Sequence, residues 1–177
     1  MGELRAESRL HAPDFWLRNP DYLAYELLSQ YRDGGRQEPE LLDAARKVLD
    51  DGEVDVRTFP MLRYLFGADE EIDEAFSLLG AYDLARVMRR PASEQRRRDF
   101  YLMPAGRTFL DALPERVPEL AWYMKRAALV AQVAGDRGGD ALKQHQKQQT
   151  EYRLTRWGQR IGSIAADVAA ELEQEGT

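Results

Sequence analysis

The pattern of the chain changes twice within residues 84–110, which read LARVMRRPASEQRRRDFYLMPAGRTFL. An apolar run around Val87 leads into a polar tip, and an aromatic run at Phe100 and Tyr101 leads out of it. Two such runs, separated by a polar segment that contains proline, are typical of a β-hairpin. The stretch continues through Pro-Ala-Gly into an amphipathic segment, so we predict a hairpin that is followed directly by a helix.

The tip of this predicted hairpin is strongly basic. Its five arginines are Arg89, Arg90, Arg96, Arg97 and Arg98. Residues 84–107 contain seven arginines and two acidic residues, a local charge of +5, whereas the rest of the chain carries −11 within a net charge of −6. The acidic remainder argues against a non-specific nucleic-acid binder, but a small basic tip can contact a few phosphates.

Further elements are predicted between residues 39 and 80. Helical periodicity covers 39–50, a short strand-like run occupies 54–56, and a second helix covers 57–66. A third helix covers 69–80, and its predicted buried face consists of Ile72, Ala75, Phe76, Leu78 and Leu79. Together with the hairpin, these elements follow the order of a winged helix, in which a β-hairpin, the wing, closes a helix-turn-helix.

The hairpin ends in a recognisable motif, Tyr101-Leu102-Met103-Pro104-Ala105-Gly106-Arg107. It resembles the closing strand and Leu-Thr-x-x-Gly-Arg turn of bacterial winged helix-turn-helix regulators of the MarR and PadR kind. Met103 stands where these regulators have a threonine that caps the next helix. The resemblance covers residues 40–113.

This resemblance implies a dimeric DNA-binding transcriptional regulator. Helix 69–80 would lie near the major groove, and the C-terminal helices would set the spacing of the DNA half-sites. The side chains expected to contact DNA are Arg89, Arg90, Arg96, Arg97 and Arg98 of the tip, with Arg57 and Arg63 of the preceding helix.

The first turns of helix 69–80 oppose this interpretation, because they are acidic. They contain Asp69, Glu70, Glu71, Asp73 and Glu74. Carboxylates stabilise a helix N-terminus but repel phosphates, and DNA readers usually carry donors there. The alternative is a non-enzymatic protein-interaction subunit of a larger complex. Residues 152–158 resemble the closing motif a second time. This similarity extends the alternative to tandem winged helices of the kind that bind kleisins.

The C-terminal part predicts one long helix over residues 141–173, because apolar residues recur there every three or four positions. Small residues on one side indicate the close approach of another helix. The residues predicted to form a homodimer interface are Trp157, Gly158, Ile161, Gly162, Ile164 and Val168. Packing against residues 118–134 of the same chain is the alternative.

The expected fold class is mainly α with a small β-hairpin wing, a winged helix-turn-helix with flanking helices at both ends. The expected regions are an N-terminal arm and helix (1–36), the winged-helix domain (37–113) and a helical dimerisation or partner-binding region (114–177). The arm is expected to be loose up to its apolar anchor at Phe15 and Trp16.

Several function classes lack their usual signals. The chain has no cysteine, and His11 and His145 have no spaced metal-ligating partners, so both are expected on the surface. No phosphate loop or serine elbow is present, so we expect no enzyme, no metal and no cofactor. Apolar runs stay below the roughly 18–20 residues that span a bilayer, which favours a cytoplasmic protein without membrane contact. Aromatic clusters leave room for a ligand pocket between the winged domain and the C-terminal helices.

Overall fold

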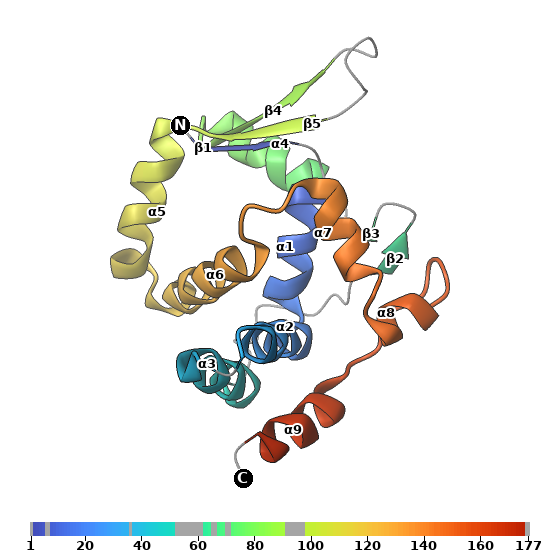
Figure 1. The fold of residues 1–177 in the computed structure, drawn as a ribbon. Helices are drawn as coiled ribbons and strands as arrows, with labels where there is room; N and C mark the ends of the chain where they lie inside the picture. The colour runs from blue at the N-terminus through green and yellow to red at the C-terminus, as the bar shows by residue number, and fades with distance from the viewer. Residues whose placement is uncertain are drawn as a thin grey trace.

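The computed structural model shows a mainly helical chain, 69% helix, with a small three-stranded antiparallel sheet (Figure 1). This confirms the predicted class at the level of helix and sheet content. The structure describes residues 2–5, 8–35, 37–51, 62–64, 67–69, 72–90 and 98–175. In this part of the chain no helix is long and apolar enough to cross a membrane.

The helices of the described residues are α1 (Ser8–Arg18), α2 (Pro20–Asp33), α3 (Pro39–Asp50), α4 (Asp73–Ala81), α5 (Pro104–Arg116), α6 (Ala121–Ala134), α7 (Gly139–Gln146), α8 (Thr150–Leu154) and α9 (Ala165–Gln174), with a short 3-10 helix, η2 (Pro118–Leu120). The strands are β1 (Gly2–Arg5), β2 (Leu62–Tyr64), β3 (Gly67–Asp69), β4 (Ala85–Arg89) and β5 (Arg98–Leu102).

Proline marks the start of several of these helices. Pro20, Pro39 and Pro104 each occupy the first position of α2, α3 and α5. The missing N–H of proline costs nothing there, and its fixed φ matches the helix.

Pro13 instead lies inside α1, which begins at Ser8. The expectation of a loose arm up to Phe15 is therefore wrong, because residues 2–5 and 8–14 form β1 and the first part of α1.

One apolar core joins both ends of the chain. Phe15, Trp16 and Tyr22 are fully buried with Tyr152 of α8, and the Phe15 ring lies 4.8 Å from that of Tyr22. The core also includes residues of α3, α6, α7 and α9. Within it, α1 lies between α6 and α7 (Figure 1). The predicted anchoring role of Phe15 and Trp16 is confirmed.

The sheet has the strand order β1-β5-β4, and all of its pairs are antiparallel. Strands β4 and β5 form the predicted hairpin, in which Val87 pairs with Phe100. The third strand is β1, whose Leu4 pairs with Phe100 from the other side. The strand expected at 54–56 lies outside the described residues.

Two predictions for the residues before the hairpin are wrong. Residues 62–64 were expected inside helix 57–66, but they form β2, which pairs with β3. Asp69 was expected to begin the third helix, but it ends β3, and α4 starts at Asp73. Short backbone pairing between 62–64 and 67–69 takes the place of helical hydrogen bonds there. Residues 52–61 lie outside the described part of the chain.

The prediction of one long helix over 141–173 is also wrong. The segment consists of α7, α8 and α9, with non-helical backbone at residues 155–164. Gly158 has a φ of +74°, which no α-helix contains. Asp21 Oδ2 accepts hydrogen bonds from Ser163 Oγ (2.8 Å) and from the Ile164 N–H (2.7 Å). These bonds hold the segment against α2 and compete with a continuous helix.

Gly106 explains the glycine of the closing motif. It is buried in the first turn of α5, where that helix crosses the chain at Leu84. A Cβ at this position would lie 2.1 Å from the Leu84 carbonyl oxygen, which also accepts a hydrogen bond from the Met103 N–H (3.0 Å). Only glycine therefore lets α5 approach the start of the hairpin this closely.

Candidate functional site

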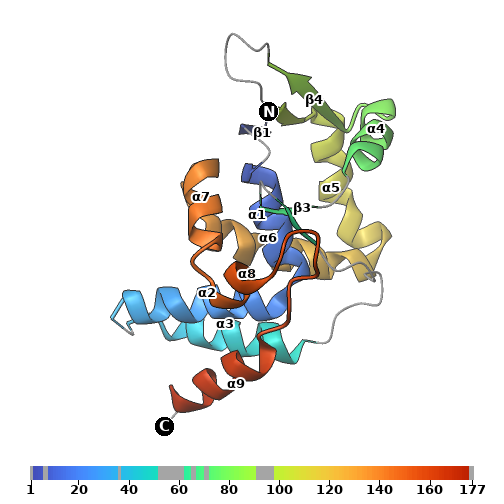
Figure 2. The same ribbon diagram turned by 90° about the vertical axis from the view of Figure 1, so that its right-hand side faces the viewer.

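The β4–β5 hairpin lies at one end of the molecule, and α9 lies at the opposite end in both views (Figures 1 and 2). Helix α4 packs beside the sheet, where the Phe76 ring is 4.8 Å from the ring of Phe100. The arrangement places the outer ends of β4 and β5, where the described part of the hairpin stops, away from the helical body.

Arg90 is held by the hairpin itself. Its Nε donates to Asp99 Oδ2 at 2.9 Å, and Asp99 is completely buried. Its Nη2 donates to the Tyr101 hydroxyl at 3.4 Å, which in turn donates to Glu3 Oε1 of β1 at 3.0 Å. The hydrogen bond to Asp99 raises the pKa of Arg90 above its ordinary value, and Tyr101 adds to the rise. Arg90 therefore offsets a buried charge and links all three strands.

Arg98 is held by the acidic start of α4. Its Nη1 forms an ion pair with Asp73 Oδ1, and its side chain is largely covered. The carboxylates that seemed to oppose DNA binding thus include one that fixes the outer end of β5, opposite Arg89, to α4. This pairing also removes one positive charge from the basic surface.

Arg89 differs from both of these side chains. It is exposed at the outer end of β4, and it forms no ion pair within the described part of the chain. Arg86, further down the same strand, pairs with Asp83 at 2.9 Å. Arg96, Arg97 and Arg57 lie outside the described residues, and for Arg63 only the backbone, in β2, is described.

Helix α4 does not have the predicted buried face. None of its residues is buried: Ala75 and Leu78 are exposed, whereas Phe76 and Leu79 are half-buried. Among the described residues its main neighbour is β4 of the narrow sheet, so a single edge is covered. Leu78 and Tyr82 are 61% and 70% exposed and lie four residues apart, which places both on one side of α4 and its C-terminal turn.

The predicted dimer residues do not share one helix face. Ile161 and Val168 are buried in the core of their own chain, and Ile164 packs against it. Gly158 and Gly162 lie in the exposed non-helical segment, where a Cβ would meet no atom within 4 Å. Trp157 is 63% exposed. Of the six residues, the tryptophan alone presents a large apolar surface outward.

Residues 152–158, which resemble the closing motif, differ in structure from the motif at residues 101–107. Residues 152–154 lie in α8, and residues 155–158 form a turn rather than a strand that enters a helix. Tyr152 is buried in the core. The hairpin is not repeated at this place.

Both histidines depart from the expected surface position. His11 is buried, and His145 is half-buried with its Nε2 2.5 Å from Glu26 Oε2. Gln149 also donates through its Nε2 to Glu26 Oε1, so the buried carboxylate of α2 has a partner on each oxygen. The partners are about 120 residues apart in sequence, which is why spacing alone gave no signal. Among the described residues no group of three or more His, Asp and Glu side chains could hold a metal ion.

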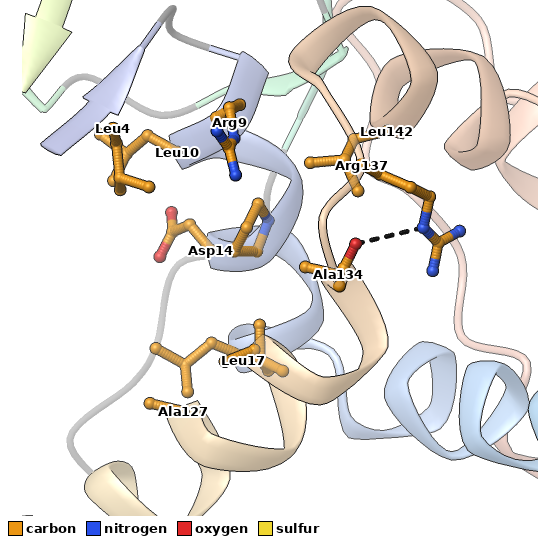
Figure 3. A pocket seen from close by; sticks show the side chains of 13 residues that line it. Leu4, Arg9, Leu10, Asp14, Leu17, Ala127, Ala134, Arg137 and Leu142 are labelled. Carbon is orange, nitrogen blue, oxygen red and sulfur yellow. Dashed lines mark hydrogen bonds between the residues drawn. The ribbon is translucent and has the colours of Figure 1, made fainter.

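A groove between α1 and α6 was not predicted at this position. It has a volume of about 410 Å³, and its walls come from five residues of α1 and four of α6. Leu4 of β1, Leu142 of α7, and Gly135 and Arg137 between α6 and α7 complete the lining (Figure 3). The sequence predicted a ligand pocket between the winged domain and the C-terminal helices. This groove lies instead between the N-terminal helix α1 and the C-terminal helices α6 and α7, and Leu4 is its one lining residue from the sheet.

The chain matches no family model, and neither the curated proteins nor the solved structures provide a match.

Proposed function

We propose that the chain is a non-enzymatic, DNA-binding transcriptional regulator of winged-helix type, which contacts DNA through the β4–β5 hairpin. The observation that carries the proposal is the placement of Arg89 at the outer end of a hairpin that follows α4. The sheet order β1-β5-β4 and the packing of α4 on Phe100 support a helix-and-wing arrangement. In the sequence, Arg96 and Arg97 lie between the two strands.

The proposal divides the five tip arginines into two groups. Arg90 and Arg98 are positioning residues, because their guanidinium groups pair with Asp99 and Asp73. Arg89, Arg96 and Arg97 are the residues that contact phosphates, with Arg57 and Arg63 as further contributors. The two ion pairs lie where the strands end and the basic segment begins, so they hold the phosphate contacts in a fixed direction.

The test is the binding of a fluorescent mixed-sequence duplex in a series from about 50 to 200 mM salt, where phosphate contacts lose affinity steeply. Replacing Arg89, Arg96 and Arg97 with alanine is expected to weaken binding to DNA of every sequence. It should also reduce the slope of log K against log salt by about 0.9 for each lost phosphate contact.

The matched control replaces Arg116, Arg156 and Arg160, which are exposed and lie outside the hairpin, with alanine. It lowers the net charge by the same amount and is expected to leave most of the affinity. If both triple variants lost the same affinity, the loss would come from the change in net charge and not from the hairpin. If the wild type did not bind DNA at low salt, DNA binding would be excluded.

A protein-interaction subunit is the second candidate, and the exposed Leu78 and Tyr82 favour it. A helix that reads base edges carries polar side chains at such positions, whereas aromatic and aliphatic side chains are typical of the core of a protein interface. A photo-crosslinking phenylalanine analogue at position 82, compared with one at the exposed Gln159, tests this in cells. A protein adduct at position 82 alone, with no DNA binding in vitro, would favour this candidate.

A further inference from the structure

The groove between α1 and α6 owes its existence to the small residues of α6. Ala127, Ala131 and Ala134 recur every three or four residues and face α1, so the side chains of that helix do not fill the space between the two axes. Opposite them, Leu10, Pro13 and Leu17 of α1 form the other wall. A row of alanines against larger apolar side chains leaves a long, shallow volume rather than a closed packing.

The lining of the groove suits an apolar molecule. Its lining includes Val130 and Leu142, both buried, and the more exposed Leu4. A volume of about 410 Å³ lies within the range of roughly 300–1,000 Å³ that is typical of small-molecule sites. Exposed apolar walls of this kind favour any occupant that removes them from water.

The polar groups of the groove are mainly cationic. Arg9, in the first turn of α1, is half-buried and has no ion pair in the described part of the chain. In Figure 3 its side chain lies between Leu10 on one side and Leu142 and Arg137 on the other. Arg137 donates to the carbonyl oxygens of Val133 and Ala134, which bind its guanidinium but only partly offset its charge.

Asp14 is the one carboxylate among the residues that line the groove, and it is already paired. Its Oδ1 accepts from Arg18 Nε at 2.8 Å. Its Oδ2 is buried without a hydrogen-bond partner, so this oxygen repels a second anion at that point. A negatively charged head group would therefore turn towards Arg9.

We infer that the groove binds a small amphipathic carboxylate, with its apolar body along the alanines of α6 and its carboxylate on the Arg9 guanidinium. The planar fork of an arginine matches a carboxylate with two parallel hydrogen bonds, which gives the head group a fixed direction. The partial positive charge at the start of α1 adds to the attraction. The inference is independent of the proposed contact with DNA.

The experiment uses 8-anilinonaphthalene-1-sulfonate, an anionic apolar fluorophore, with the full chain. Its displacement is measured with octanoate, octanol and octylamine, which share the same apolar body and differ in the charge of the head group. Octanoate is expected to displace the probe at a concentration at least about tenfold lower than octanol, since a charge-assisted hydrogen bond contributes at least that factor. Octylamine is expected to be weaker than octanol.

Two substitutions locate the site. Arg9→Gln is expected to remove the preference for octanoate over octanol, whereas Arg156→Gln, at an exposed arginine outside the groove, keeps it. Ala131→Leu fills the groove and is expected to abolish probe binding, whereas Ala128→Leu, at an exposed position of α6 that does not line the groove, leaves it intact.

Equal displacement by octanoate and octanol would overturn the assignment of a carboxylate. Unchanged probe binding in a folded Ala131→Leu protein would overturn the assignment of the groove. If far-UV circular dichroism shows that Ala131→Leu does not fold, the comparison of Arg9→Gln with Arg156→Gln decides the outcome alone. Because no DNA is present in this experiment, its failure leaves the test of the proposed function untouched.

Discussion

At the scale of the residue, Gly106 sets how closely α5 approaches the hairpin. Gly106→Ala would force a Cβ against the Leu84 carbonyl oxygen, 2.1 Å away, and this atom belongs to rigid backbone. We expect the free energy of unfolding to fall by about 1–3 kcal/mol, the usual cost of overpacking, as measured by urea denaturation. Gly162→Ala, where a Cβ meets nothing within 4 Å, is the control and should change stability by less than about 0.5 kcal/mol. Similar values for both variants would contradict this account of the motif glycine.

The buried carboxylate of Glu26 provides a second prediction at this scale. Glu26→Leu leaves the Gln149 amide and the His145 ring without their acceptor, and should destabilise the fold by about 1–3 kcal/mol. Glu26→Gln should cost clearly less, because the Gln149 amide can rotate and present its oxygen to the new donor. Thermal unfolding of the two variants compares them, and an equal loss in both would show that the charge, not the hydrogen bond, stabilises this site.

At the scale of the element, Asp21 determines where α9 docks. Its Oδ2 accepts from Ser163 and from the backbone of Ile164, just before α9 begins. Asp21→Ala removes both bonds, so we expect trypsin to cleave after Arg160 about tenfold faster, consistent with the loss of a hydrogen bond to a charged group. Asp167→Ala, at an exposed position on α9 itself, should leave the rate unchanged. An unaltered cleavage pattern in Asp21→Ala would mean that apolar packing of Val168 and Leu172 alone holds the helix.

Some of these elements could be predicted from the sequence, and others could not. The β4–β5 hairpin was predictable because its two strands lie close together in the sequence, and α2 and α3 were predictable because helical periodicity is local. The break of the C-terminal helix was not, since its apolar residues keep helical spacing while Asp21 holds Ser163 and Ile164 from about 140 residues away.

Arg90 pairs with Asp99 within the hairpin, but no residue pattern distinguishes this paired arginine from the exposed Arg89. The partnership of β1 with β5 and the groove along α6 depend on contacts between distant segments, which periodicity does not encode.

At the scale of the whole molecule, the predicted homodimer can be tested through Trp157. This side chain and Leu154, three residues before it, are 63% and 66% exposed. We expect the wild type to sediment as a dimer at micromolar concentration and Trp157→Arg as a monomer, because a charge in an apolar interface is strongly unfavourable. Tyr82→Arg, at an exposed aromatic residue outside the C-terminal segment, is the matched control and should remain dimeric. A wild type that sediments as a monomer would remove the dimer from the proposed mechanism.

The three-stranded sheet also imposes an order on folding during synthesis. Strand β1 leaves the ribosome about 95 residues before its partner β5, which at roughly 5–20 residues per second is a delay of about 5–20 seconds. The β4–β5 hairpin, by contrast, closes within about 1–10 μs once both strands are available. For those seconds each nascent chain carries an unpaired strand, and neighbouring chains on one messenger do so together. Exchange of β1 between such neighbours is the assembly error to which this topology exposes the protein, and slower translation would increase it.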